Sequence, residues 1–126
     1  MAPFNHITLG VSDLKKSTEF YLNILELRQI DEPFKQGKHS WFHLRDHCQL
    51  HLVVEKKLKN SDNPQWHFAF TVPDVEAFIK KLEAADIDYG GIEDPSKKIL
   101  LRPDGIKQIY FQDPDGYWIE VNNDTY

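Results

Sequence analysis

Three histidines and one glutamate stand at paired positions in the 126-residue chain, and together they could bind a divalent metal ion. His6 in the first half corresponds to His67 in the second half, and His51 corresponds to Glu120. Imidazole nitrogens suit Zn²⁺, Ni²⁺, Co²⁺ or Fe²⁺, and one carboxylate offsets half of the charge of the ion. If one coordination position stays open, such a site would supply Lewis-acid chemistry.

A constant interval along the chain reveals an internal repeat. Four residues recur 61 positions later as the same or a similar type. His6, Val11, Asp13 and Leu14 correspond to His67, Val72, Asp74 and Val75. The segment around His51 returns around Glu120 after a slightly longer interval, and the polar loop at residues 92–105 can hold the extra residues. The two pairs therefore occupy equivalent places in two copies.

Each copy begins with a predicted strand and helix. Alternating apolar and polar residues predict strands over residues 4–11 and 66–72, and each strand leads into a helix. Ser12 or Asp13 can cap the first helix and Asp74 the second, because a short polar side chain accepts a hydrogen bond from the first turn. The apolar residues at helical spacing are Leu14, Phe20, Tyr21, Ile24 and Leu25 in the first helix and Val75, Phe78, Ile79 and Leu82 in the second.

Three short strands are expected after each helix. They cover residues 27–31, 40–45 and 49–54 in the first copy and 89–92, 107–112 and 117–122 in the second. Turns are expected near Gly37, near Asp46 and at residues 113–116, and a polar linker at residues 56–64. The predicted fold class is α+β. Two βαβββ modules, over about residues 4–55 and 66–122, form a single domain of residues 1–126.

Strand alternation places the ligand-type residues on one face of the predicted sheet. His6 shares its face with Thr8, whereas Ile7 and Leu9 lie on the opposite face, which we expect beneath the helix. A mixed sheet that curls around a metal cavity would bring His6, His51, His67 and Glu120 together.

Four histidines in the first half recur at every fourth position, which on a helix would form a metal-binding stripe. The segment that holds His39, His43, His47 and His51 has strand periodicity instead, so the spacing is interpreted as coincidence. We expect His39 and His47 in exposed turns and His43 on a partly exposed strand.

Composition excludes several classes of protein. Fifteen Lys and Arg against 20 Asp and Glu give a formal charge of −5, which disfavours nucleic acid and anionic membrane as partners. No apolar stretch approaches the roughly 20 residues of a membrane span, and the first residues lack the pattern of a signal peptide. The single cysteine, Cys48, excludes an intramolecular disulfide and is expected to be a buried small residue. We therefore expect a cytoplasmic protein with a small-molecule substrate.

Four segments resemble the vicinal oxygen chelate superfamily, the group of glyoxalase I, fosfomycin-resistance thiol transferases, extradiol dioxygenases and bleomycin-resistance proteins. The segments are residues 5–14 (NHITLGVSDL), 17–21 (STEFY), 66–72 (WHFAFTV) and 111–120 (FQDPDGYWIE). The resemblance implies paired βαβββ modules around one divalent metal ion (Zn, Ni, Co, Fe or Mn) and a homodimer. His6, His67 and Glu120 fall on positions that the metal-dependent members use as ligands.

His51 departs from the pattern, because it falls where glyoxalase I carries a glutamate. Two interpretations stay open: His51 is a fourth metal ligand, or it is a base beside the metal. The leading hypothesis is a glyoxalase-like lyase or isomerase in which Glu120 and His51 are catalytic. Its substrate would be a small oxygenated molecule chelated to the metal.

Three other functions remain as alternatives. A dioxygenase-like enzyme would use His6, His67 and Glu120 as a facial triad, with Tyr110 touching the substrate. A fosfomycin-type thiol transferase would use Thr8 and Tyr110 on its substrate. A ligand-sequestering protein of the bleomycin-resistance type would bind no metal, with Trp118 and other tryptophans lining its cavity. Trp66 is expected in the core or at an interface, and residues 92–105 are the expected lid.

Overall fold

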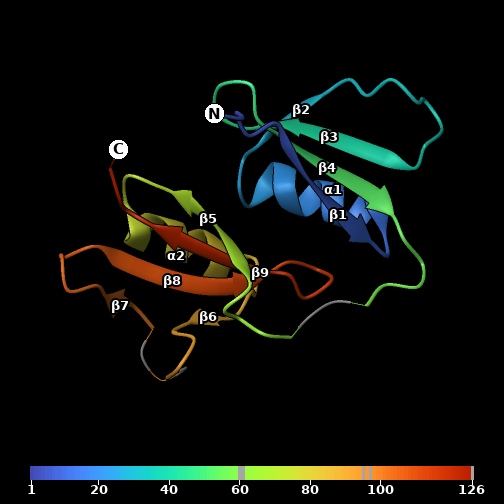
Figure 1. Ribbon diagram of the computed structural model, residues 1–126. Helices are drawn as coiled ribbons and strands as arrows, with labels where there is room; N and C mark the ends of the chain where they lie inside the picture. The colour runs from blue at the N-terminus through green and yellow to red at the C-terminus, as the bar shows by residue number, and fades with distance from the viewer. Residues whose placement is uncertain (60–61, 95, 97, 126) are drawn as a thin grey trace. The chain divides into compact units, whose positions relative to one another are not determined.

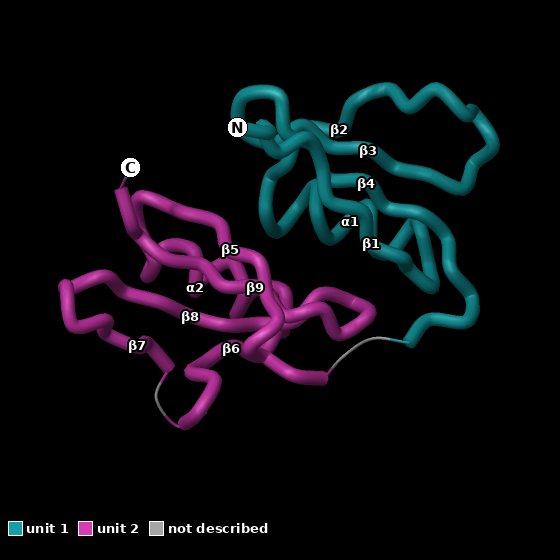
Figure 2. Tube along the Cα trace, viewed as in Figure 1, with its two compact units in different colours: residues 1–59 teal, residues 60–126 magenta. Residues whose placement is uncertain are grey.

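The computed structural model describes residues 1–59, 62–94, 96 and 98–125 and divides the chain into two compact units. Unit 1 comprises residues 1–59 and unit 2 residues 60–126 (Figure 2). Each unit consists of one mixed sheet and one helix (Figure 1). The α+β class and the repeated strand, helix and strand order are thereby confirmed.

Unit 1 contains a four-stranded sheet in the order β1-β4-β3-β2. Its elements are β1 (His6–Val11), α1 (Leu14–Asn23), β2 (Arg28–Ile30), β3 (His39–His43) and β4 (Gln49–Val54). The first and last strands pair in parallel, whereas β3 pairs antiparallel with both β4 and β2. Parallel pairing of β1 with β4 is possible because α1 and two strands lie between them in the chain.

Unit 2 repeats this topology in the order β5-β9-β8-β6, with one short additional strand. Its elements are β5 (His67–Thr71), α2 (Val75–Ala84), β6 (Tyr89–Gly90), β7 (Leu100–Leu101), β8 (Lys107–Gln112) and β9 (Trp118–Asn122). The strands β5 and β9 pair in parallel, and β8 pairs antiparallel with β9, β6 and β7.

The repeat extends to the register of the strands. Thr8 lies opposite His51 in unit 1, and Ala69 lies opposite Glu120 in unit 2. Thr8 and Ala69 each stand two positions after the first histidine of their copy, so the register agrees with the repeat in the sequence. The antiparallel neighbours correspond as well, because Trp41 pairs with His51 and Tyr110 with Glu120. His51 and Glu120 are therefore equivalent positions of one scaffold.

Both helices begin at an aspartate, as predicted. The Oδ1 atom of Asp13 accepts the backbone N–H of Lys16 at 3.0 Å, and that of Asp74 accepts the N–H of Ala77 at 3.0 Å. Such a cap contributes about 1 kcal/mol to stability, because it accepts a hydrogen bond from a backbone N–H that has no partner within the helix.

Each helix packs its apolar side against one face of its sheet. Tyr21 of α1 contacts Phe42 with ring centroids 6.1 Å apart, and Phe78 of α2 contacts Phe111 at 5.7 Å. Burial of each such side chain contributes roughly 1.5–3 kcal/mol. His51 and Glu120 lie on the opposite faces of their sheets, away from the helices.

Several details differ from the predictions. The strand β7 was not predicted, and it lies inside the loop 92–105. His39 is the half-buried first residue of β3 rather than an exposed turn residue. Trp66 precedes β5 and is 73% exposed, so its placement in the core was wrong. Cys48 is half-buried, and its thiol donates to the carbonyl of Phe4 at 3.4 Å.

Neither helix has the length and apolar composition that a membrane span requires, within the part of the chain that the structure describes.

Candidate functional site

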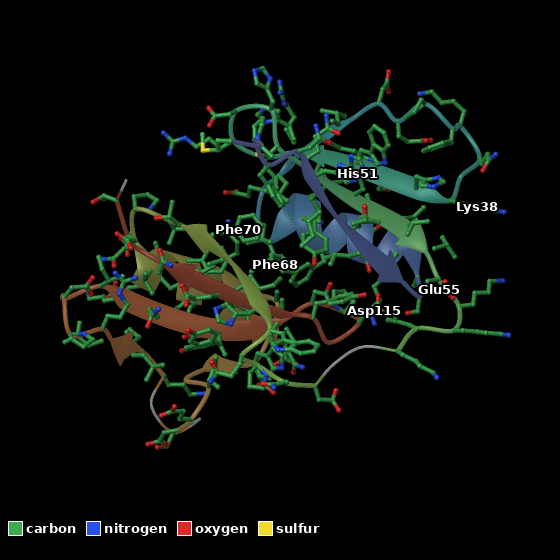
Figure 3. The ribbon with its side chains drawn as sticks, viewed as in Figure 1. Lys38, His51, Glu55, Phe68, Phe70 and Asp115 are labelled. Atoms are coloured by element: carbon green, nitrogen blue, oxygen red, sulfur yellow. The ribbon has the colours of Figure 1, made fainter. Side chains whose placement is uncertain are left out.

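The four predicted metal ligands form two pairs, one in each unit. His6 and His51 lie on β1 and β4 of unit 1, and Figure 3 shows His51 on the sheet. His67 and Glu120 lie on β5 and β9 of unit 2. Each pair consists of direct neighbours within its own unit.

In unit 2, two acceptor atoms face each other. The Nδ1 atom of His67 lies 2.9 Å from the carbonyl oxygen of Pro64, which can only accept, so Nδ1 carries the hydrogen. In the neutral ring, Nε2 then presents its lone pair, and it lies 3.6 Å from Oε1 of Glu120. Two arrangements stabilise these facing atoms: a proton on Nε2, which makes an ion pair with Glu120, or a metal ion bound by both atoms.

Glu120 is buried and held on both of its oxygens. Oε1 accepts hydrogen bonds from the hydroxyl of Tyr110 at 2.6 Å and from the amide of Gln108 at 2.9 Å. Oε2 accepts from the amide nitrogen of Asn122. The Asn122 amide is itself oriented, because its oxygen accepts the N–H of Asp124 at 3.0 Å. These donors compensate the buried negative charge and fix its direction.

Tyr110 supplies a permanent donor to this carboxylate. Burial, and then the hydrogen bond to Glu120, raise the pKa of the Tyr110 phenol. The hydroxyl therefore keeps its proton throughout the neutral range. The ring of Tyr110 also meets the ring of His67 edge-on, with centroids 5.2 Å apart, and so links both members of the pair.

In unit 1, His51 is sandwiched between two rings. The Trp41 indole stacks on one side at 3.8 Å with planes 3° apart, and the His6 imidazole stacks at 4.3 Å with planes 19° apart. The Nε2 atom of His51 donates to the side-chain oxygen of Gln49 at 2.7 Å. Burial, followed by the proximity of His6 and His39, lowers the pKa of His51. The ring is therefore neutral near pH 7, with its free lone pair on Nδ1.

The stacking bears on whether His51 is a metal ligand. An imidazole binds a metal through a lone pair in the plane of its ring, and the planes of His6 and His51 are nearly parallel. Lone pairs in parallel planes do not point to one atom. If both rings are to bind one ion, one of them must first turn out of the stack.

The remaining predicted site residues have distinct surroundings. Thr8 is exposed and lies beside His51 across the β1–β4 pair. Trp118 is half-buried on β9, and its indole N–H donates to the carbonyl of Asp62 at 3.3 Å.

The predictions missed the residues that support His51 and Glu120. Gln108 and Asn122 bind Glu120, while Gln49 and Trp41 hold His51. Alternation along β8, β9, β4 and β3 is the signal that could have revealed them, since each lies on the same sheet face as the residue it supports.

The donor set suits a divalent ion in kind, with imidazole nitrogens and one carboxylate. Each pair supplies two donors, and within the described residues no group of three or more His, Cys, Asp or Glu is arranged to hold a metal. Each pair by itself supplies two of the three or four protein ligands of a typical metal shell.

Residues 4–121 match the family described as the Glyoxalase/Bleomycin resistance protein/Dioxygenase superfamily. The chain is 27% identical to a lactoylglutathione lyase of Pseudomonas aeruginosa, over 94% of this chain and 80% of that protein. It is 32% identical to a metallothiol transferase FosB of Lysinibacillus sphaericus, over 96% and 82%. The crystal structure of a glyoxalase/dioxygenase from Nostoc punctiforme superposes with a TM-score of 0.78 and 26% identity, over 98% of this chain and 92% of that one.

Proposed function

Because the chain belongs to the glyoxalase, bleomycin-resistance protein and dioxygenase superfamily, we propose that it is a metal-dependent lyase or isomerase of the glyoxalase type. The observation that carries this proposal is the buried carboxylate of Glu120, 3.6 Å from the lone pair of His67. The names of its relatives include lactoylglutathione lyase and metallothiol transferase, both names of enzymes.

In this proposal His6, His67 and Glu120 hold one divalent metal ion, and His51 stays outside the shell. The ion, when bound, would act as a Lewis acid toward two adjacent oxygens of the substrate. His51 is kept apart by its stack with Trp41 and its hydrogen bond to Gln49. The nearly parallel planes of His6 and His51 support this division of roles.

The chain's own groups then move and hold protons. His51 is neutral and immobilised, so its Nδ1 atom can take a proton from one substrate carbon and return it to the neighbouring carbon. Thr8 lies opposite His51 in the strand register, which supports the proposal that its hydroxyl group orients the substrate. Tyr110 and Gln108 keep the Glu120 carboxylate in place while the proton moves.

A thiol transferase acting on a phosphonate is less well supported. A phosphonate needs cationic partners, but Arg102 is paired with Asp104 and Asp124, and Lys107 with Glu76. A homodimer remains part of the proposal, on family membership alone.

The proposal is tested by metal content and turnover together. Protein purified without chelator or affinity tag should contain about one Ni, Zn or Co per chain by elemental analysis and convert a 2-oxoaldehyde mixed with a thiol. His67→Ala should lose the metal, whereas the exposed His47→Ala should retain it as the matched control. Iron with oxygen uptake on a catechol would favour a dioxygenase, and no metal uptake on titration would favour a ligand-sequestering protein.

A further inference from the structure

A hollow of about 320 Å³ opens in unit 2 beside the Glu120 pair. Its walls include the side chains of Tyr110, Gln112 and Trp118 and the segment from Asp88 to Ile92. Every lining residue belongs to unit 2.

Two lining residues of the hollow, Tyr110 and Trp118, lie next to Glu120, which does not itself line the hollow. Tyr110 lines the hollow with its ring and donates its hydroxyl proton to Glu120 at 2.6 Å. Trp118 lies two positions before Glu120 on β9, hence on the same face of the sheet. A molecule that reached the Glu120 carboxylate would therefore meet this hollow with its adjoining substituent.

The walls are aromatic and fixed in place. Tyr110 is only 8% exposed and is hydrogen-bonded at its hydroxyl. The Trp118 indole is anchored to the Asp62 carbonyl, and Gly90, opposite Tyr110 on β6, presents no side chain. Two immobilised rings and a bare backbone suit a flat apolar group, whereas the Gln112 amide adds one hydrogen-bonding partner.

The charges beside the hollow are unfavourable for an anion. Asp88 is the one charged residue among its described lining residues, and Lys98, which lies over the Tyr89 ring, is not a lining residue. Residues 60–126 contain six Lys and Arg against thirteen Asp and Glu. An anion placed here would lose water and would find no cationic partner among the described lining residues. The volume lies at the small end of roughly 300–1,000 Å³ for ligand pockets, which fits one ring rather than a whole tripeptide thiol.

We propose that this hollow binds a flat substituent of the substrate that carries no negative charge, such as an aryl group, and excludes anionic groups. The inference rests on the proposed function, since it assigns the substrate class of the same site. It separates this chain from enzymes whose substrates carry a phosphonate or a carboxylate at that place.

The test uses three ring-sized probes that differ in charge: benzamide, benzylamine and benzoate. Each is titrated into ¹⁵N-labelled full-length protein while the Trp118 indole N–H resonance, assigned with Trp118→Phe, is followed. Benzamide and benzylamine should shift this resonance saturably, and benzoate should bind about tenfold more weakly or not at all. Equal affinity for benzoate and benzamide, or no shift with benzamide, would overturn the proposal.

A charge-gain variant makes the test sharper. Gln112→Arg places a cation in the wall and should raise benzoate affinity by about tenfold. Gln29→Arg on β2 of unit 1 is the matched control and should leave all three titrations unchanged. If Gln112→Arg does not improve benzoate binding, charge does not decide what the hollow accepts.

The probes require no metal, so this test is separate from that of the proposed function. A metal titration of the same sample tests the metalloenzyme. Metal binding without probe binding would reject the hollow alone, and probe binding without metal binding would reject the metalloenzyme while keeping the hollow. As a final readout, phenylglyoxal with an uncharged thiol should show a lower KM than methylglyoxal with glutathione.

Discussion

Unit 1 and unit 2 place different chemistry on the same strand register. His51 and Glu120 occupy equivalent positions, yet His51 is enclosed by the rings of Trp41 and His6 while Glu120 is enclosed by hydrogen-bond donors. One set of surroundings lowers the pKa of an imidazole, and the other holds a carboxylate in a fixed direction. A repeated backbone thus presents two unlike groups at equivalent positions, because the chemistry of each group depends on its neighbours across the strands.

The correspondence extends to the supporting residues. Tyr110 in unit 2 is equivalent to Trp41 in unit 1. Tyr110 lies opposite Glu120 in the strand register, and Trp41 lies opposite His51. Asn122 is equivalent to Val53, because Asn122 follows Glu120 by two positions and Val53 follows His51 by two positions. Exchanging residues between equivalent positions therefore tests whether each half owes its chemistry to its neighbours.

The largest effect is expected from Glu120→Gln, which removes the charge that distinguishes unit 2. Loss of an anionic ligand should lower metal affinity by more than the roughly 10–100-fold seen for outer-shell changes. Turnover should vanish with it. Elemental analysis of the metal content per chain measures the loss of metal, with the exposed Glu55→Gln as the control. Retention of full metal by Glu120→Gln would remove Glu120 from the shell.

The second effect concerns the role of His51. Since its ring is stacked and held by Gln49, His51→Ala should keep the metal and lower kcat by about 10²–10⁴-fold, as expected for a lost base. Metal content and steady-state kinetics are measured on one preparation. Loss of the metal would instead identify His51 as a fourth ligand and would make the two units more alike.

A smaller effect should follow Asn122→Val, which gives unit 2 the residue of unit 1. The change leaves Oε2 of Glu120 and the N–H of Asp124 without their partner, so the free energy of unfolding should fall by about 1–3 kcal/mol. Metal affinity should fall about 10–100-fold. Val53→Asn is the matched control and should leave metal affinity unchanged. Denaturant unfolding and metal competition measure the two effects separately.

The smallest effect is expected from Tyr110→Phe. The pKa of Tyr110 is raised in the folded state, so its contribution to stability is complete below the pKa of a free tyrosine, near 10, and declines as the pH rises above it. Ultraviolet titration of the native protein should show a late-ionising phenol that Tyr110→Phe lacks. At neutral pH the variant should lose about 0.5–1.5 kcal/mol of stability. An unchanged titration curve would contradict the assignment.

The repeat, both aspartate caps and the strands β4 and β8 could be predicted from the sequence, because each depends on local pattern. The strand β7 could not, since its short segment is ordered there only by pairing with β8. Of the two alternatives for Trp66, the core was wrong, because hydrophobicity alone does not reveal that a residue precedes the edge strand β5.

The candidate site was predictable in part. Histidine and glutamate at repeated spacing can be recognised in a sequence. The structure contains them as two pairs of neighbouring residues, one pair in each unit. Alternation puts Gln108 and Asn122 on the face of Glu120, but it does not reveal their hydrogen bonds, because the role of an amide depends on the group it contacts. The stacking of His51 on Trp41 depends in the same way on contacts between strands.

The parallel closure of each unit has a consequence for how the protein folds. In unit 2, β5 pairs with β9, although α2, β6, β7 and β8 all lie between these two strands in the chain. Contacts between segments so far apart form slowly, because a long loop must close before they are gained. Until β9 docks, Phe68 and Phe70 on β5, shown in Figure 3, lack the strand beside them. His67 and Glu120 lie on these two strands, so the pair of unit 2 is assembled only when this long-range pairing forms.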